Sequence, residues 1–325
     1  MKRFIAFAAF LLVALPLFAE IPVHTFSIVA RDPQTGEIGV AVQSHYFSVG
    51  GVVPWAEAGV GAVATQSFVE VSYGPLGLEL MKAGKTAPEA LDSLLASDAA
   101  RDTRQVAMID AAGNVKAWTG KKCITAAGDH TGVNYSAQAN LMANDRVWPA
   151  MANAFEHSTG MLAERMLAAL DAAQAAGGDI RGEQSAAILV VSGTKTGVWW
   201  KDRLVDLRVE DNPHPIAELR RLLKIQQAYK HEDRGDEFVA QKKMPEALKE
   251  YETAAQLDPD NNELLFWYAV GAYTGGNESK ALEIFAKVFA RDQRWIELVD
   301  RLPASDLLPA DAVPKIKAAA SKPAH

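Results

Sequence analysis

The sequence predicts an α+β domain over about residues 25–230, followed by a small all-α module of helical repeats. Two observations predict this division. Between residues 25 and 209, β-rich runs and amphipathic helical runs occur in groups, in the order strands, helices, strands, helices, strands. After about residue 230, small and aromatic residues recur with a period of about 34 residues. The grouping of the strands favours an α+β domain over a strictly alternating parallel sheet.

Composition excludes several classes of protein. The chain has 325 residues, of which 49% are hydrophobic and 22% are charged, as in folded globular proteins. It contains 33 Lys and Arg residues against 40 Asp and Glu residues, so its net charge is −7. A general nucleic-acid binder presents a basic surface, and we therefore expect no nucleic-acid partner.

The first residues have the pattern of a cleaved secretory signal. A short cationic start, Met1-Lys2-Arg3, precedes an apolar run at residues 4–18 and a small residue, Ala19. We therefore expect residues 1–19 to be a signal peptide and the mature protein to be periplasmic or secreted. No cysteine precedes Glu20, and no later stretch reaches the roughly 18 apolar residues of a membrane span, so we expect no membrane anchor.

The elements of the first domain are predicted from apolar spacing and from the turn formers between the apolar runs. Its first half contains a hairpin, a third strand, two helices with a proline near the first turn, and a second hairpin. In chain order these are residues 25–30, 37–43, 61–67, 75–83, 88–96, 105–110 and 115–119. Its second half contains a strand, two long helices and three strands, at residues 135–141, 147–155, 161–176, 185–191, 197–200 and 204–209.

The C-terminal module shows two matching sets of small and large residues. The first set is Gly235, Phe238, Ala247, Tyr251, Ala254 and Pro259, and the second is Ala269, Ala272, Ala281, Phe285 and Val288. The pattern resembles two tetratricopeptide repeats over residues 231–293, a scaffold that holds protein partners. Two repeats are fewer than the three usually needed for stability, so we expect the module to pack against the helix at residues 215–230 or to form part of a homo-oligomer. Residues 294–325 form a tail, which is predicted to be frayed from Pro303.

The strongest signal of a site is the glycine-rich loop at residues 176–187. Its three glycines let the backbone approach a ligand, because glycine has no Cβ atom. The polar residues that could contact a substrate here are Asp179, Arg181, Gln184 and Ser185. Arg181 offers a planar fork to a substrate carboxylate. The alternative is a helix cap at Gly177 followed by a turn that an Asp179–Arg181 pair holds in place.

Three further candidates lie at the ends of predicted strands: Gln66, Asn140 and His45. The Asn140 amide could donate to an oxyanion, and the His45 imidazole could act as an acid or a base. The alternatives are a local turn bond for Asn140 and a surface or packing role for His45.

Four segments resemble the DUF1028 family in order and spacing: residues 25–32, 59–66, 104–110 and 176–187. That family is uncharacterised and is grouped with the N-terminal nucleophile (Ntn) hydrolases. The resemblance covers about residues 25–230. It implies a four-layer α/β/β/α sandwich with a site at one end of the paired sheets.

The same resemblance implies that Thr25 is the catalytic residue. In an Ntn hydrolase the hydroxyl of an N-terminal Thr attacks an amide carbonyl, while its own α-amine, with a pKa of about 7.7–8.0, serves as the base. Residues 20–24 lie between the expected signal cleavage and Thr25, so a second cleavage after His24 is needed. Otherwise Thr25 is only the first residue of a structural strand, because Thr is common in strands.

We therefore expect an exported Ntn-type hydrolase that cleaves an amide bond in a small molecule or a cell-envelope peptide. The alternative is a non-catalytic binding protein on the same fold, whose repeats recruit a partner. We expect no cofactor and no metal ion. Cys123 is the only cysteine, Asp129 and His130 are adjacent rather than at the spacing of metal ligands, and no His-Glu-x-x-His motif occurs.

Overall fold

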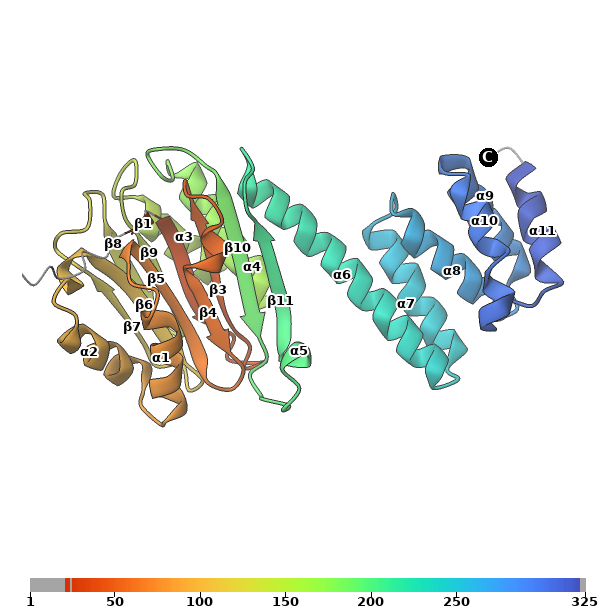
Figure 1. The fold of residues 1–325 in the computed structure, drawn as a ribbon. Helices are drawn as coiled ribbons and strands as arrows, with labels where there is room; N and C mark the ends of the chain where they lie inside the picture. Colours follow the sequence, from red (N-terminus) through yellow and green to blue (C-terminus); the bar gives the residue numbers. More distant parts are fainter. Residues whose placement is uncertain (1–20, 24, 322–325) are drawn as a thin grey trace, which may run out of the picture. The chain divides into compact units, whose positions relative to one another are not determined.

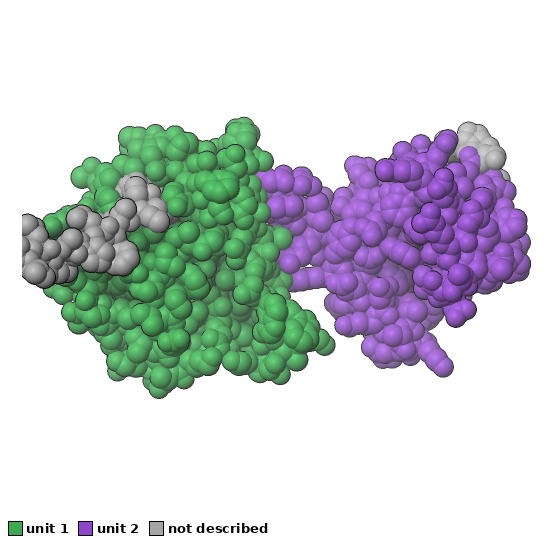
Figure 2. All heavy atoms as spheres, viewed as in Figure 1, with its two compact units in different colours: residues 1–216 green, residues 217–325 purple. Residues whose placement is uncertain are grey.

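The computed structural model describes residues 21–23 and 25–321. The chain forms two compact units, Met1–Ile216 and Ala217–His325, which Figure 2 shows in different colours. The described strands all lie in the first unit, and the second is built from helices. The predicted α+β class is thereby confirmed. The predicted signal peptide lies outside the described residues.

The first unit contains two antiparallel sheets. Sheet A has the order β1-β5-β6-β7, with β4 also paired to β5. Its strands are β1 (Ile21–Val23), β4 (Pro54–Glu57), β5 (Gly61–Val69), β6 (Arg104–Asp110) and β7 (Val115–Thr119). The last two form the predicted second hairpin. Asp110 fixes its turn, because Asp110 Oδ1 accepts hydrogen bonds from the backbone N–H groups of Ala112 and Asn114, both at 3.0 Å.

Sheet B has the order β11-β10-β3-β2-β9-β8. Its strands are β2 (Thr25–Arg31), β3 (Ile38–Ser44), β8 (Gly128–Gly132), β9 (Tyr135–Ala139), β10 (Ser185–Val191) and β11 (Arg203–Val209). Strands β2 and β3 form the predicted first hairpin, with Thr25 paired to Ser44. Asp32 Oδ1 closes the turn between them by accepting from the N–H groups of Gln34 at 2.7 Å and Thr35 at 3.0 Å.

The two sheets share an apolar core. Alternate residues of β2, β3 and β10, such as Val29, Val42 and Leu189, pack with Ala64 and Ile109 of sheet A. Because side chains alternate along a strand, every second residue faces this core and the others face the opposite side of the sheet. The same alternation decides which polar side chains lie between the sheets at their ends.

Four helices pack on the outer faces of the sheets (Figure 1). Helices α1 (Tyr73–Lys82) and α2 (Ala87–Ser97) cover sheet A and bury Val63, Val106 and Met108. Helices α3 (Val147–His157) and α4 (Leu162–Ala175) pack against sheet B. All four were predicted to within two residues at each end. Figure 1 shows the sheets face to face between these helix pairs.

One predicted strand, at residues 197–200, is wrong. Residues 197 and 198 lie in a loop, and Trp199 and Trp200 begin the short helix α5 (Trp199–Asp202). Asp202 Oδ1 accepts hydrogen bonds from Thr196 N at 3.0 Å and Thr196 Oγ1 at 2.6 Å, which closes the chain into a local turn. Trp199 and Trp200 are 66% and 63% exposed, so the apolar pattern that predicted a strand has no core to face.

The second unit consists of packed helices: α6 (Pro215–Ala240), α7 (Met244–Leu257), α8 (Asn262–Thr274), α9 (Glu278–Arg291), α10 (Arg294–Val299) and α11 (Ala312–Ala318). The predicted repeat positions have the expected packing. A Cβ atom on Gly235 would lie 2.4 Å from the Tyr251 ring, and one on Gly271 would lie 2.8 Å from it. Because glycine has no side chain, the neighbouring helices can pack closely around Tyr251.

The predicted fraying of the tail from Pro303 is wrong for the described residues. Leu302, Leu308 and Ile316 are buried in the same core as Phe285 and Val288 of the second repeat. The tail was predicted to be frayed from its Ala, Pro and Lys content. Its few apolar side chains nevertheless pack on the last repeat and cover its apolar surface. Terminal repeats need such a cap, because their apolar face has no further neighbour.

The second unit contains a carboxyl group with an unusual pKa. Burial, followed by the nearby charges of Asp236, Glu263 and Asp233, raises the pKa of Glu232 to about 7. A carboxyl whose pKa is raised in the folded state stabilises that state at low pH, and this contribution is lost as the pH rises through 7. We expect Glu232→Gln to stabilise the unit by about 1 kcal/mol at pH 8. This is less than the full pKa shift corresponds to, because solvent screens the partly exposed carboxyl group.

The same variant should match the wild type near pH 4.5, where Glu232 is protonated in the folded protein. Thermal unfolding at several pH values, followed by circular dichroism, measures the difference. Glu237→Gln, on an exposed position of the same helix, is the matched control. A difference between Glu232→Gln and the wild type that does not change with pH would contradict this prediction.

Candidate functional site

Polar side chains gather at one end of the paired sheets, where β2 and β10 begin and β3 ends. Ser44 pairs with Thr25 on one side and with Ser185 on the other, so the three residues form a row across sheet B. All three are buried. They face the space between the sheets, because Val42 and Ala187, each two residues along the strand, belong to the shared core.

A network of side-chain amides fills the space beside this row. Gln105 Oε1 accepts from Gln66 Nε2 at 2.7 Å and from Asn140 Nδ2 at 2.9 Å. Ser27 Oγ donates to Gln66 Oε1 and accepts from Gln138 Nε2, both at 2.6 Å. These residues come from β2, β5, β6, β9 and the residue after β9, and all are buried. The network therefore ties the two sheets together with satisfied polar groups.

Thr25 is attached directly to this network. Its carbonyl oxygen accepts from the backbone N–H of Asn140 at 3.1 Å, from Gln66 Nε2 at 3.2 Å and from Asn140 Nδ2 at 3.4 Å. Each of these side-chain amides donates to both Gln105 and Thr25, and Gln66 Nε2 also donates to Gln138 O at 3.5 Å. Gln66 and Asn140 thus hold the backbone of Thr25, and neither amide points into open space.

The glycine-rich loop forms the rim of this end of the sheet. The buried Asp179 carboxylate accepts from Arg181 Nε at 3.0 Å and Arg181 Nη2 at 2.6 Å. It also accepts from the backbone N–H groups of Arg181 at 2.9 Å and His45 at 3.2 Å. The Asp179–Arg181 pair therefore joins the loop to the residue that follows β3.

The same glycines also end helix α4. Gly177 and Gly178 have φ angles of 126° and 57°, a region that side chains disfavour. The backbone N–H of Gly178 donates to Ala173 O at 3.0 Å, as in a helix C-cap. The loop thus has both features of its structural alternative, a helix cap and a turn held by an Asp–Arg pair. Contact of its polar residues with a substrate stays a prediction.

The remaining predicted residues bond to neighbouring loops. His45 is exposed, with Nδ1 3.3 Å from Glu183 O. Gln184 Nε2 donates to Asp211 Oδ1 at 3.2 Å. Ser185 Oγ donates to Tyr46 O at 2.5 Å and accepts from Val49 N at 3.1 Å, which fixes the loop after β3. The structure thus brings Thr25, Gln66 and Asn140 together between the sheets and places the others around them.

Sequence reasoning missed half of the buried network. The missed residues are Ser27, Ser44, Gln105 and Gln138. A signal was present for Ser44 and Gln105, since each lies at or next to the end of a strand whose other inward positions are apolar. Gln105 is the clearer example, because Gln is rarely buried without partners.

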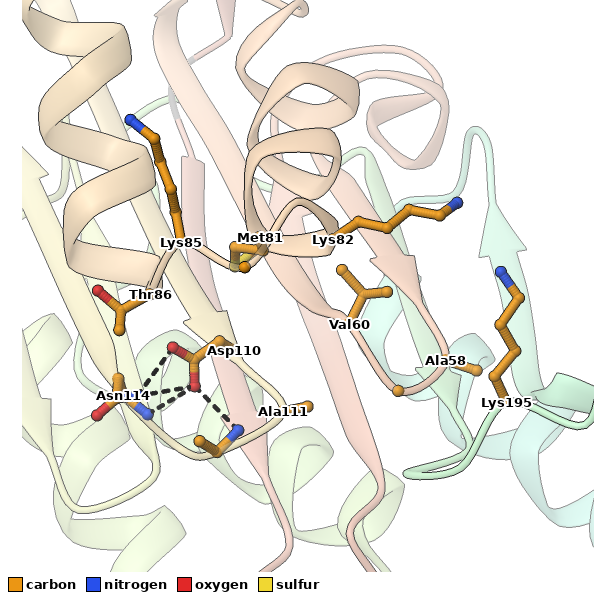
Figure 3. A pocket seen from close by; sticks show the side chains of 13 residues that line it. Ala58, Val60, Met81, Lys82, Lys85, Thr86, Asp110, Ala111, Asn114 and Lys195 are labelled. Atoms are coloured by element: carbon orange, nitrogen blue, oxygen red, sulfur yellow. Dashed lines mark hydrogen bonds between the residues drawn. The ribbon is translucent and has the colours of Figure 1, made fainter.

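A pocket of 430 Å³ lies at the opposite end of the same strands, beside the start of β5 and the end of β6 (Figure 3). Lys82 and Lys195 on its wall each place Nζ 2.8 Å from Glu57 Oε1. Figure 3 also shows Asp110, whose carboxylate bonds to Asn114. These charged groups are engaged with one another and with the fold. In the described part of the chain, no cluster of three or more His, Cys, Asp or Glu side chains could hold a metal ion.

Arg181→Lys should separate the two roles of the loop pair. A lysine keeps the charge but loses the planar fork, so the buried Asp179 carboxylate would lose one of its side-chain donors. We expect a loss of about 1–3 kcal/mol in stability, measured by urea unfolding. Unchanged stability, together with a lower hydrolysis rate, would instead assign Arg181 to substrate binding.

The comparisons with known proteins cover both units. A model described as a family of unknown function, DUF1028, matches residues 25–219, and a TPR repeat model matches residues 235–270. The crystal structure of a DUF1028 protein from Silicibacter pomeroyi is similar, with a TM-score of 0.56 and 33% sequence identity. The alignment covers 62% of this chain and 88% of that chain. No curated protein matches. The predicted resemblance to the DUF1028 family is confirmed over residues 25–219, and that to a tetratricopeptide repeat is confirmed over residues 235–270.

Proposed function

The chain belongs to the DUF1028 family, whose function is unknown, and from this premise we propose that its first unit is an amide hydrolase of the N-terminal nucleophile type. The observation that carries the proposal is the place of Thr25. It is the first residue of β2, it lies in the polar row, and amides from both sheets hold its carbonyl. The helix pairs outside the two sheets fit the four-layer sandwich of that superfamily.

The proposed reaction needs Thr25 to be the first residue of the mature chain. Its α-amine then takes the proton of its own hydroxyl as Oγ1 attacks the amide carbonyl of the substrate. The C–N bond breaks, the amine product leaves with that proton, and the acyl group remains on Thr25 as an ester. Water then cleaves the ester, which releases a carboxylic acid and restores the hydroxyl. Gln66 and Asn140 hold the Thr25 backbone throughout.

We further propose that the protein is exported and that its substrate is a small amide or a cell-envelope peptide. The signal-like residues 1–19 support export. In the described part of the chain, no helix combines the length and the apolar character needed to cross a membrane. The repeats suggest protein–protein interaction in general, and we propose that they bring the hydrolase to a partner chain or to a second copy of itself.

A specific observation favours the alternative of a non-catalytic binding protein. The amides of Gln66 and Asn140 both donate to Gln105, and Thr25 follows a segment that is itself paired in sheet A. Such an arrangement satisfies the buried polar groups within the fold, without a substrate. On this alternative the repeats recruit a partner and the sandwich carries no nucleophile.

Trapping of the acyl group distinguishes the two functions. Two chains that share the C-terminus, one beginning at Thr25 and one at Glu20, are incubated with an activated acyl ester and digested for mass spectrometry. The hydrolase proposal predicts an acyl group on the peptide that begins at Thr25, and only in the first chain. Equal acylation and turnover in both chains would exclude Thr25 as an N-terminal nucleophile, and acylation of neither chain would favour the binding protein.

A further inference from the structure

Strand β1 occupies an edge of sheet A directly before Thr25. Its register places Ile21 opposite Val69, Pro22 opposite Phe68 and Val23 opposite Ser67. Strand β4 pairs with residues 61–64 on β5, so β1 covers a different stretch of that strand. In the described part of sheet A, residues 68 and 69 have β1 as their strand partner.

Proline fixes which pairs of this short ladder carry hydrogen bonds. Residues of an antiparallel pair alternate between positions that exchange N–H···O bonds and positions that do not. Pro22 has no N–H group, so the pair with Phe68 is one that does not exchange them. On this alternation, the two flanking pairs, at Ile21 and Val23, are the ones that exchange N–H···O bonds and hold β1 to the edge. Two such pairs make a weak attachment for a free peptide.

The chain passes from sheet A to sheet B within one residue of Thr25. Val23 is paired with Ser67 in sheet A, and Thr25 is paired with Ser44 in sheet B. Gln66, next to Ser67, donates to the Thr25 carbonyl at 3.2 Å. The edge of β5 at residues 67–69 thus holds a peptide whose C-terminal end leads to the Thr25 nucleophile.

We infer that this edge is the binding site for the acyl part of the substrate, and that the substrate is a peptide bound as an extended strand. The inference rests on the proposed function. Cleavage after His24 would leave residues 20–24 as the acyl half of the broken bond, held by the pairs just described. When that segment departs, an exposed strand edge remains, and an extended peptide can add to it through main-chain hydrogen bonds. The acyl residue of the substrate then takes the place of His24 in the sequence.

The register gives this site a specificity that can be tested. The second residue before the scissile bond, in the place of Val23, must donate its N–H group to the β5 edge. The third residue, in the place of Pro22, needs no N–H group. The site therefore accepts proline at the third position and rejects it at the second, whatever the side chains on either face.

Peptide binding tests the inference without relying on hydrolysis. The probe is the fluorescein-labelled peptide Glu-Ile-Pro-Val-His, and fluorescence anisotropy measures its affinity for a chain that begins at Thr25. We expect N-methylation of its valine to weaken binding at least tenfold, because the N–H of that position is lost. Replacement of its proline by alanine should leave binding unchanged, because that position donates nothing.

Two forms that begin at Glu20 complete the test. The wild-type chain should not bind the probe, since its own residues 21–23 fill the edge. The Val23→Pro variant cannot make the bond at that position, so its edge should open and bind the probe. This variant keeps the test valid if the chain beginning at Thr25 fails to fold.

The outcomes distinguish failure of the peptide-site inference from failure of the proposed hydrolase function. Equal affinity for the methylated and unmethylated probes, or absence of binding to Val23→Pro, overturns the peptide site. Selective binding without hydrolysis of any peptide amide keeps the peptide site and overturns the hydrolase. Hydrolysis of small amides by a chain that binds neither probe keeps the hydrolase and overturns the peptide site.

Discussion

Thr25→Ala, in a chain that begins at residue 25, is expected to lower the rate of amide hydrolysis at least about a thousandfold, as loss of a nucleophile does in other hydrolases. The variant keeps the α-amine and the backbone that Gln66 and Asn140 hold, and it removes the attacking hydroxyl together with the γ-methyl group. Thr25→Ser restores that oxygen and should retain measurable turnover. Steady-state rates on a peptide amide measure both.

A control substitution separates this effect from a general loss of structure. Thr35→Ala removes a hydroxyl at the far end of the same hairpin, where it accepts from Glu37 N at 3.2 Å. Its rate should match that of the unaltered chain. If Thr25→Ala hydrolyses the substrate as fast as this control does, the hydroxyl of Thr25 has no part in the reaction.

Gln105→Leu is expected to cost about 3–5 kcal/mol of stability in the first unit, because several buried groups lose their partner together. Gln66 Nε2 and Asn140 Nδ2 lose the acceptor at 2.7 Å and 2.9 Å, and the carbonyl of Ala139 loses a donor at 2.9 Å. Leucine fills a similar volume, so the loss reports the polar groups. Urea unfolding, with hydrogen exchange in residues 104–110 to identify the unit, measures it.

The matched control is Gln184→Leu, which removes a single hydrogen bond to Asp211 at the rim. It should change stability by no more than about 0.5 kcal/mol. Equal effects from the two substitutions would show that the amide network contributes little to the contact between the sheets.

The parts of the fold that could be predicted are those with a local cause. The hairpin of β2 and β3 follows from apolar runs around a turn that Asp32 closes. Helix α4 was predicted from its apolar spacing, and its end from Gly177. Strands β1, β4 and β8 escaped prediction. The first two are short and contain a proline, and β8 is an edge strand with exposed polar residues. All three are defined by the strand they pair with.

In the site too, contacts between residues close in the sequence could be predicted, and contacts between strands could not. Asp179 and Arg181 are two residues apart, and their pairing was one of the alternatives weighed from the sequence. The contacts of Gln105 with Gln66 and with Asn140 depend on the register of three strands in two sheets. No spacing along the chain encodes them. The helical repeats were identified because their small and aromatic positions recur at a fixed period.

The N-terminal residue of the active protein tests the central claim most directly. Protein recovered from the compartment to which it is exported is separated by intact mass into its processed forms, and each form is sequenced from its N-terminus and assayed on the same peptide amide. We predict that turnover follows the fraction of chains that begin at Thr25, and that forms beginning at Glu20 are inactive. Full activity in a preparation whose chains all begin at Glu20 would contradict the Thr25 mechanism.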